Sequence, residues 1–169
     1  MKNRKEPRDP LVRISGDCLM PNHFHLLFEE IKDGGISRFM HKLGTGYVEY
    51  FNHKYDRVGT LFQSRFKAEI VDNDEYLQYL LVYINVLNPG QLVEPNLKEE
   101  GVKDIKKVMK FAEQFPWSTH QEYLNKRKSI IIEKGLLGEI FSNPKHYRNF
   151  CESVLIEKKI NEIPHLFLE

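Results

Sequence analysis

The sequence predicts an α+β fold, with a mixed core over residues 11–90 and helices after it. Three observations support this prediction. Short alternations of apolar and polar residues near the start are typical of paired strands. Apolar residues at steps of three and four follow, as in amphipathic helices that cover a sheet. From residue 93 the pattern changes to short helical stretches separated by Pro, Gly and Asn. We therefore expect a core domain over residues 1–92 and a helical extension over residues 93–169.

The first expected element is a β-hairpin. Residues 11–14 alternate in polarity, and residues 17–20 can continue the same strand. A Pro-Asn pair at residues 21–22 predicts a turn, because proline fixes φ and asparagine bonds its own backbone. The second strand begins near His23, and alternation places His23 and His25 on one face, with imidazoles about 7 Å apart. Two such imidazoles can bind one metal ion, although two core histidines with polar partners would give the same pattern.

A long helix is expected after the hairpin. Apolar residues recur at helical spacing over residues 36–53, which predicts an amphipathic helix with Ser37 as its N-cap. Gly44 and Gly46 lie within this helix, and each lowers helix stability by about 1 kcal/mol relative to alanine. A close packing contact or backbone approach is the expected reason for both glycines.

The remaining elements are shorter. Residues 60–71 alternate in polarity and predict one or two strands. A second helix is expected over residues 76–87, with an N-cap in the Asp-Asn-Asp run at residues 72–74 and a stop at the Asn-Pro-Gly of residues 88–90. Further short helices are expected at residues 102–114, 119–127, 129–141 and 144–158.

Composition and charge narrow the functional classes. The 169 residues carry a formal net charge of +1, so overall charge gives no argument for nucleic-acid binding. Residues 38–67 are locally basic, with six Lys or Arg against two Asp or Glu. Cys18 and Cys151 have no metal-like spacing, which favours a reduced, cytoplasmic setting. The first ten residues lack the apolar core of a signal peptide, and no apolar run is long enough to cross a membrane.

Five motifs occur in order along the chain. They are LMPNHFHLL at residues 19–27, MHKL with YFN at residues 40–43 and 50–52, GTLFQSRFK at residues 59–67, YI with NP at residues 83–84 and 88–89, and FPWS at residues 115–118. Together, these motifs resemble the REP-associated tyrosine transposases, relatives of the single-tyrosine HUH transposases of IS200-like elements. The resemblance covers nearly the whole chain, and five ordered motifs are far more specific than one His-x-His.

The resemblance implies a ferredoxin-like antiparallel sheet whose central strand carries the two histidines. It implies cutting and rejoining of single-stranded DNA, often beside imperfect hairpins, through a 5′-phosphotyrosine intermediate and a free 3′-hydroxyl. By motif, His23, His25 and Asn88 become ligands of Mg²⁺ or Mn²⁺. Tyr83 becomes the nucleophile. Periodicity alone would place Tyr83 in the core beside Tyr79, so its role rests on the resemblance.

The tyrosine and the asparagine depart from the spacing of the family. Relatives place the asparagine four residues after the tyrosine, whereas Tyr83 and Asn88 are five residues apart. Four α-helical residues return to within about 40° of the starting face, and five end about 140° away. Either a π-bulge or a helix end near residues 86–87 redirects Asn88, or the third ligand is lost.

The start of the chain also departs from the family. Relatives carry a strand and a helix before the stretch equivalent to Leu11, where this chain has a polar stretch of ten residues. We therefore expect the ferredoxin-like sheet to lack its first strand and helix. The histidine strand would then have unpaired amides beside Phe24, Leu26 and Phe28, which favours low solubility, marginal stability or association through that edge.

The last predictions concern DNA. Arg57, Arg65 and Lys67 are expected to contact phosphates. Phe62 and Phe66 share a strand face and are expected in the core. The expected function is a metal-dependent transesterase of single-stranded DNA, acting as a monomer or a homodimer. The alternative is a truncated remnant that only binds DNA. A metal hydrolase is a third possibility, less favoured because no nearby acidic residue completes its ligand set.

Overall fold

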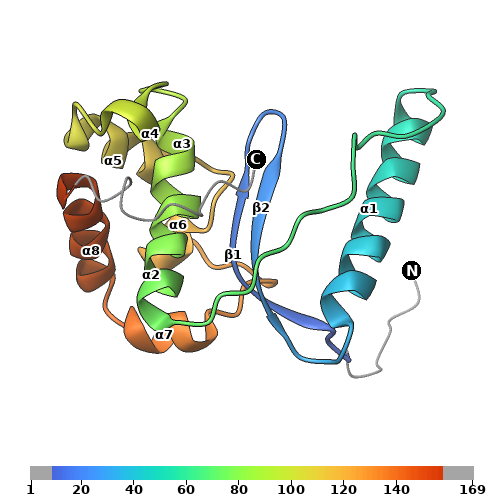
Figure 1. Cartoon of the computed structure of the whole chain (residues 1–169), viewed down its shortest axis with the longest axis horizontal. Coiled ribbons are helices and arrows are strands. Elements are labelled where there is room, and N and C mark those ends of the chain that lie inside the picture. The colour runs from blue at the N-terminus through green and yellow to red at the C-terminus, as the bar shows by residue number, and fades with distance from the viewer. Residues whose placement is uncertain (1–8, 158–169) are drawn as a thin grey trace. The chain divides into compact units, whose positions relative to one another are not determined.

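The computed structural model describes residues 9–157, which form two strands and a series of helices (Figure 1). These elements confirm the predicted α+β class. The described chain divides into two compact units, one of residues 9–13 and 28–67, the other of residues 14–27 and 68–157. The expectations for the first eight residues, and for the end of the last helix at residue 158, lie outside the described residues.

The two strands form the expected hairpin. Strands β1 (Val12–Leu19) and β2 (Phe24–Glu30) pair in a two-stranded sheet, antiparallel because a connection this short allows no other direction. The connection contains the predicted Pro-Asn turn and is closed by a hydrogen bond of 2.8 Å from Met20 N to His23 O. Among the described residues β2 pairs with β1 alone, which is consistent with the expected ferredoxin-like sheet short of one strand.

The extension covers the outer edge of β1. Leu19 N donates to Trp117 O at 2.8 Å, and Thr119 N donates to Asp17 O at 3.0 Å. Residues 132–133 pair with the same strand nearer its start. These bonds satisfy backbone groups that a strand edge would otherwise leave to solvent or to another chain.

In the first unit, helix α1 (Gly35–Lys54) confirms the first predicted helix. Its N-cap is Gly34, with φ of 65°, and not Ser37, which lies inside the helix. Glycine adopts this left-handed conformation readily because it has no Cβ. A Cβ on Gly35 would collide with the carbonyl oxygen of Leu11, so the start of α1 requires a second glycine.

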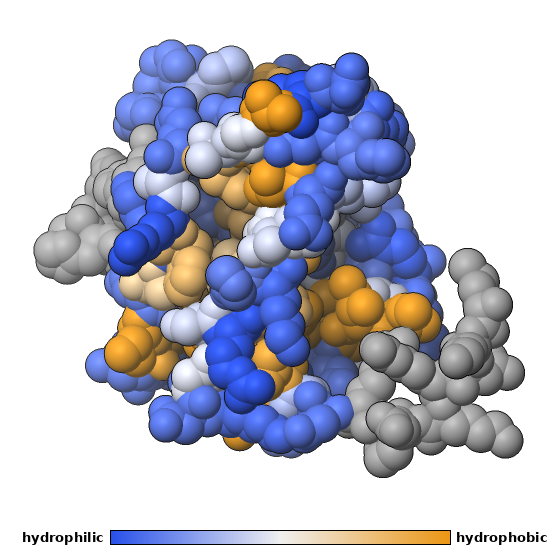
Figure 2. All heavy atoms as spheres, turned by 90° about the vertical axis from the view of Figure 1, so that its right-hand side faces the viewer, coloured by the Kyte–Doolittle hydropathy of each residue, from blue (hydrophilic) through white to orange (hydrophobic). Residues whose placement is uncertain are grey.

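Helix α1 buries no side chain, since Gly35 is its one buried residue. Apolar residues along it, such as Leu43 and Tyr50, are exposed. The side of the molecule shown in Figure 2 accordingly carries hydrophobic residues scattered among hydrophilic ones. A Cβ built on Gly44 or Gly46 would meet no atom within 4 Å. The packing reason predicted for these two glycines is therefore wrong for the described residues.

Residues 60–71 form neither strand nor helix, so the strands predicted there are wrong. Most of these residues are exposed. Alternation specifies a strand only where a neighbouring strand accepts its ladder of hydrogen bonds, and the described sheet has two strands, both of them in the hairpin. Among the described residues, no strand lies beside residues 60–71 to accept these hydrogen bonds.

A continuous helical segment, residues 74–90, lies in the core of the second unit, and we call it the rod. Helix α2 (Asp74–Val82) begins at Asn73, whose side chain accepts a hydrogen bond of 2.7 Å from Tyr76 N, which confirms the predicted N-cap. A π-helix, η1 (Tyr83–Leu87), and the single turn α3 (Asn88–Gly90) continue it. The helical segment extends three residues past the predicted end at residue 87 and ends within the predicted Asn-Pro-Gly stop, at Gly90.

Five helices follow in the described part of the extension. They are α4 (Leu97–Glu100), α5 (Ile105–Gln114), α6 (His120–Tyr123), α7 (Gly135–Ile140) and α8 (Pro144–Glu157). Helices α5 and α8 confirm two predictions. The other two predicted helices are reduced to α6 and α7. Asn125, after α6, has a left-handed φ of 55°, and residues 132–133, before α7, pair with β1. Helix α4 was not predicted. No described helix has the length and apolar character needed to cross a membrane.

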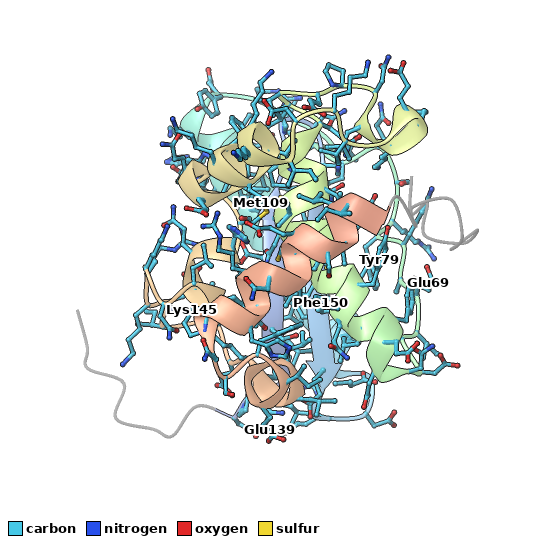
Figure 3. All side chains as sticks on the ribbon, turned by 90° about the vertical axis from the view of Figure 1, so that its left-hand side faces the viewer. Glu69, Tyr79, Met109, Glu139, Lys145 and Phe150 are labelled. Carbon is cyan, nitrogen blue, oxygen red and sulfur yellow. The ribbon has the colours of Figure 1, made fainter. Side chains whose placement is uncertain are left out.

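The core of the second unit surrounds this rod. Helices α2 and η1 lie between the hairpin on one side and α5 and α8 on the other (Figure 1). On the hairpin side, a Cβ on Gly16 of β1 would stand 3.4 Å from Leu81 Cδ1, so this glycine allows close approach. On the other side, α5 contributes Met109 and α8 contributes Phe150 (Figure 3). Residues 81–90 are all buried as a result.

Candidate active site

Two histidines stand side by side at the start of β2. The ring centroids of His23 and His25 are 5.0 Å apart, and the ring planes meet at 88°. Residues two apart on an extended chain share a face, so the predicted juxtaposition is confirmed. His23 lies just before the strand and therefore belongs to the turn.

The turn also orients the first imidazole. His23 Nδ1 lies 2.7 Å from Asn22 Oδ1. An amide oxygen can only accept a hydrogen bond, so Nδ1 carries the ring proton and the lone pair resides on Nε2. Metal-binding histidines show this arrangement, in which the second ring nitrogen donates to an oxygen. Asn22 is thus a positioning residue, although the sequence indicates only its place in a turn.

Tyr83 begins the π-helix and reaches the histidines. Its ring centroid is 5.8 Å from that of His25, and the ring planes meet at 83°. The Tyr83 side chain is buried, with 5% of its surface exposed. The structure therefore brings together three of the predicted site residues, the two histidines and the tyrosine.

The π-helix changes the position of Asn88 relative to Tyr83. Asn88 N donates to Tyr83 O, an i→i+5 bond in place of the α-helical i→i+4 bond. Residues five apart therefore lie close to one above the other, which removes the divergence of about 140° expected in an α-helix. Of the alternatives that the spacing left open, the structure contains the π-bulge.

The Asn88 amide has one unsatisfied end. Its side chain is fully buried, and Oδ1 accepts a hydrogen bond of 3.2 Å from Gln91 Nε2. Nδ2 has no hydrogen-bond partner among the described residues. Buried polar atoms are normally satisfied, so this amide marks a place where a further group fits. Rotation of the amide by half a turn would present its oxygen there, and a matching rotation of the Gln91 amide would keep the hydrogen bond between the two side chains. Metal ligation by Asn88 stays a prediction.

These donors fit a metal ion that takes part of its shell from its substrate. Two imidazoles and one amide oxygen suit Mn²⁺, which accepts nitrogen ligands more readily than Mg²⁺ does. The part of the chain that the structure describes contains no cluster of three or more His, Cys, Asp and Glu side chains. Positions beyond the three predicted ligands would therefore be filled by phosphate oxygens and water.

Two neighbouring tyrosines are held in their protonated form. Burial raises the pKa of Tyr79 to about 12, and Tyr83 and Tyr76 add to the shift. Burial, followed by the nearby Glu69 carboxylate, raises the pKa of Tyr76 to about 12. Tyr79 and Glu69 are labelled in Figure 3. Because the phenolate is the better nucleophile, neither tyrosine is activated at neutral pH.

The Tyr83 hydroxyl has a different neighbour. Lys98 Nζ donates to Tyr83 Oη at 2.9 Å and lies 5.0 Å from the ring centroid. Lys98 is 9% exposed and belongs to the short helix α4. Gly90 permits this approach, because a Cβ there would stand 2.9 Å from Leu97 Cδ1. The sequence offers no periodic or motif signal for Lys98, because a one-turn helix is too short to have a period.

A buried network fixes the π-helix to the extension. Asn85 Oδ1 accepts a hydrogen bond of 2.8 Å from Thr119 Oγ1, and Asn85 Nδ2 donates to Tyr147 Oη at 3.0 Å. Tyr147 Oη lies 2.9 Å from His120 Nδ1. Burial lowers the pKa of His120 to about 4, so the imidazole in this network is neutral at pH 7. This network holds the backbone that carries Tyr83, and no sequence pattern points to it.

The predicted DNA-contact residues lie in the first unit. Arg57 is exposed, and its guanidinium carbon lies 5.6 Å from the ring centroid of Phe51. Arg65 and Lys67 are exposed in the irregular segment that follows. Their contact with DNA stays a prediction.

Exposed aromatic residues accompany these cations. Phe62 and Phe66 are 41% and 45% exposed, so their predicted place in the core is wrong. That prediction depended on a strand that does not form. The Phe62 ring centroid is 6.2 Å from that of Tyr47, and Lys54 Nζ is 5.3 Å from the ring centroid of Tyr55. Exposed aromatic rings interspersed with cations are typical of surfaces that bind single-stranded nucleic acid.

Residues 9–86 match the model of a family described as "Transposase IS200 like". The matched segment contains both histidines and Tyr83, and it ends before Asn88 and before the extension. No curated protein and no solved structure matches the chain. Over this part of the chain, the protein is therefore similar to the IS200-like transposases.

Proposed function

We propose that the chain is a metal-dependent transesterase of single-stranded DNA, of the REP-associated tyrosine transposase type, with Tyr83 as its nucleophile. The observation that carries this proposal is the meeting of three side chains: His25 lies 5.0 Å from His23 and 5.8 Å from Tyr83, between ring centroids. A candidate metal-binding pair beside a buried tyrosine supplies the two parts of metal-assisted phosphotyrosine chemistry, a nucleophile and a site for positive charge. The match to the IS200-like transposases is independent support.

The proposed reaction exchanges one phosphoester for another. Tyr83 Oη attacks the phosphorus, and the bond from phosphorus to the 3′-oxygen breaks as the new bond forms. The proton of the Tyr83 hydroxyl passes to the departing 3′-oxygen. The products are a 5′-phosphotyrosine and a free 3′-hydroxyl, and attack by a 3′-hydroxyl reverses the step. Since the phosphodiester energy is retained in the covalent intermediate, rejoining needs no external energy source.

His23 and His25 would hold the metal, with Asn88 as the candidate third ligand. A bound Mg²⁺ or Mn²⁺ supplies positive charge that offsets the negative charge developing on the phosphate oxygens. Asn22 supports this role, because it keeps the lone pair of His23 on Nε2.

DNA contacts in this proposal come from the first unit. Arg57, Arg65 and Lys67 bind phosphates, and the exposed rings of Tyr47 and Phe62 stack on unpaired bases. Stacking on a ring requires a base outside a duplex, which favours single-stranded DNA, including the strand beside a hairpin. The protein is proposed to act in the cytoplasm, as a monomer or a homodimer.

Covalent trapping tests the proposal. The full chain is incubated with a pool of end-labelled single-stranded oligonucleotides that contain a hairpin and varied flanks, in Mn²⁺, in Mg²⁺ or in EDTA. We expect a DNA–protein adduct that survives denaturing electrophoresis in the presence of metal and is absent in EDTA. DNA binding without an adduct in either metal would contradict the proposal and would instead support a remnant that only binds DNA.

A further inference from the structure

The ammonium of Lys98 lies on the oxygen that would attack DNA. Lys98 Nζ donates to Tyr83 Oη at 2.9 Å, and the same nitrogen lies 5.0 Å from the centre of the tyrosine ring. Both side chains are buried. Away from bulk water, an ammonium acts on a neighbouring oxygen with less screening than it would at the surface.

The fold holds this lysine in place. Lysine is rarely buried, because removing its charge from water is unfavourable. Leu97, the residue before it, is 1% exposed and anchors the start of α4. A Cβ on Gly90 would stand 2.9 Å from Leu97 Cδ1 and 3.0 Å from Val108 Cγ1, so a larger residue at this position would force these side chains to shift. By contrast, Lys103 nearby is exposed and forms an ion pair with Glu100.

We propose that Lys98 is a further catalytic residue, supplied by the extension beyond the segment that matches the family. This inference rests on the proposed function. As Tyr83 Oη attacks, its proton moves toward the departing 3′-oxygen ahead of the new bond, so Oη carries negative charge that the Lys98 ammonium offsets while Lys98 keeps its own proton. In rejoining, Oη leaves with the electron pair of the broken phosphorus–Oη bond. The ammonium then offsets its negative charge until the proton of the attacking 3′-hydroxyl arrives.

Variants of two lysines test this role in the full chain. Lys98→Met removes the charge and keeps an unbranched side chain, whereas Lys98→Arg keeps a charge at the same position. Lys103→Met is the matched control, because it removes an exposed lysine of the same segment. The measurements are the single-turnover rates of adduct formation and of its reversal by an added 3′-hydroxyl strand, the DNA affinity and the thermal unfolding midpoint.

We expect Lys98→Met to slow both directions by about 100-fold, as for the loss of one donor to a developing oxyanion. DNA affinity should stay unchanged, Lys98→Arg should recover part of both rates, and Lys103→Met should match the wild type. Wild-type rates in Lys98→Met would overturn the proposal. Should Lys98→Met fail to fold, Lys98→Gln keeps a donor and tests the charge alone, and a wild-type rate of rejoining in this variant would overturn the proposal.

The two proposals fail differently in this experiment. A wild-type chain without an adduct, or an adduct that persists in Tyr83→Phe, would overturn the chemistry of Tyr83 and with it the role of Lys98. A Tyr83-dependent adduct whose rates do not change in the Lys98 variants would overturn the role of Lys98 alone.

Discussion

Helix α1 and the rod formed by α2, η1 and α3 have similar spacing of apolar residues, but only the rod has buried side chains. Helix α1 buries no side chain, whereas residues 79–90 are buried throughout. Spacing therefore identifies a helix without revealing what covers it. The rod carries the tyrosine of the candidate site, and α1 and the segment after it carry exposed rings and cations. We propose that the rod supports the chemistry and that the exposed residues bind the DNA.

Replacing histidines of the candidate site and of helix α1 should give the largest difference in adduct formation. His23→Ala and His25→Ala should each abolish the metal-dependent adduct, because each removes a predicted metal ligand. His53→Ala, at the exposed end of α1, should leave the adduct unchanged. Binding of single-stranded DNA, followed by fluorescence anisotropy, should persist in all three variants. Metal-dependent cleavage retained by either of the first two would refute the metal assignment.

Leucine truncations compare the burial of the two helices. Leu81→Ala in α2 should lower the free energy of unfolding by about 2–5 kcal/mol, the usual range for a fully buried leucine. Leu43→Ala in α1 should change it by less than about 1 kcal/mol, because Leu43 is 42% exposed. Urea unfolding followed by circular dichroism measures both. A comparable loss at Leu43 would mean that α1 is covered in solution.

Lowering the pH should weaken the buried hydrogen-bond network that includes Asn85, Tyr147 and His120. Burial lowers the pKa of His120 from 6.5 to about 4 in the folded chain. Between these values the unfolded chain binds a proton that the folded chain does not, so stability from the neutral imidazole is present above pH 6.5 and is lost as pH falls toward 4. The loss is on the order of 3 kcal/mol.

A His120→Gln variant isolates this effect. Asp17 titrates in the same window with the opposite sign, because burial raises its pKa to about 6, but it is present in both chains. The unfolding free energy of the wild type minus that of His120→Gln should therefore decrease between pH 7 and pH 4.5. A difference that stays constant, or that grows as pH falls, would show that His120 is not buried as a neutral base.

Single cations should give the smallest effect. Arg57→Ala should weaken binding of single-stranded DNA several-fold. It should also reduce the slope of log affinity against log salt concentration by about the amount that one phosphate contact contributes. Lys106→Ala, which removes an exposed lysine of α5, should leave the affinity and the slope unchanged. Equal effects of the two substitutions would mean that Arg57 contributes no more to DNA binding than an exposed lysine elsewhere on the protein.

Local geometry explains what the sequence could predict. The two-residue spacing of His23 and His25 places them on one face of a strand. The five-residue interval between Tyr83 and Asn88 indicated that a π-bulge or a helix end would be needed if both were to serve one site. Both features depend on neighbours in the chain. The α+β class followed from polarity patterns of the same local kind.

Features set by distant contacts could not be predicted. Residues 117–119 have no alternation, yet they pair with β1, which is distant in the sequence. Lys98 lies in a single helical turn without a period. Residues 60–71 show the converse case, because they alternate in polarity but have no neighbouring strand.

The central claim is that Tyr83, and no other tyrosine of the rod, forms the covalent bond to DNA. The trapped adduct can be digested with protease and nuclease and the modified peptide identified by mass spectrometry. We predict a nucleotide on Tyr83, an adduct lost in Tyr83→Phe, and an adduct unchanged in Tyr79→Phe. A nucleotide on Tyr79 or Tyr76, or an adduct that survives in Tyr83→Phe, would contradict the claim.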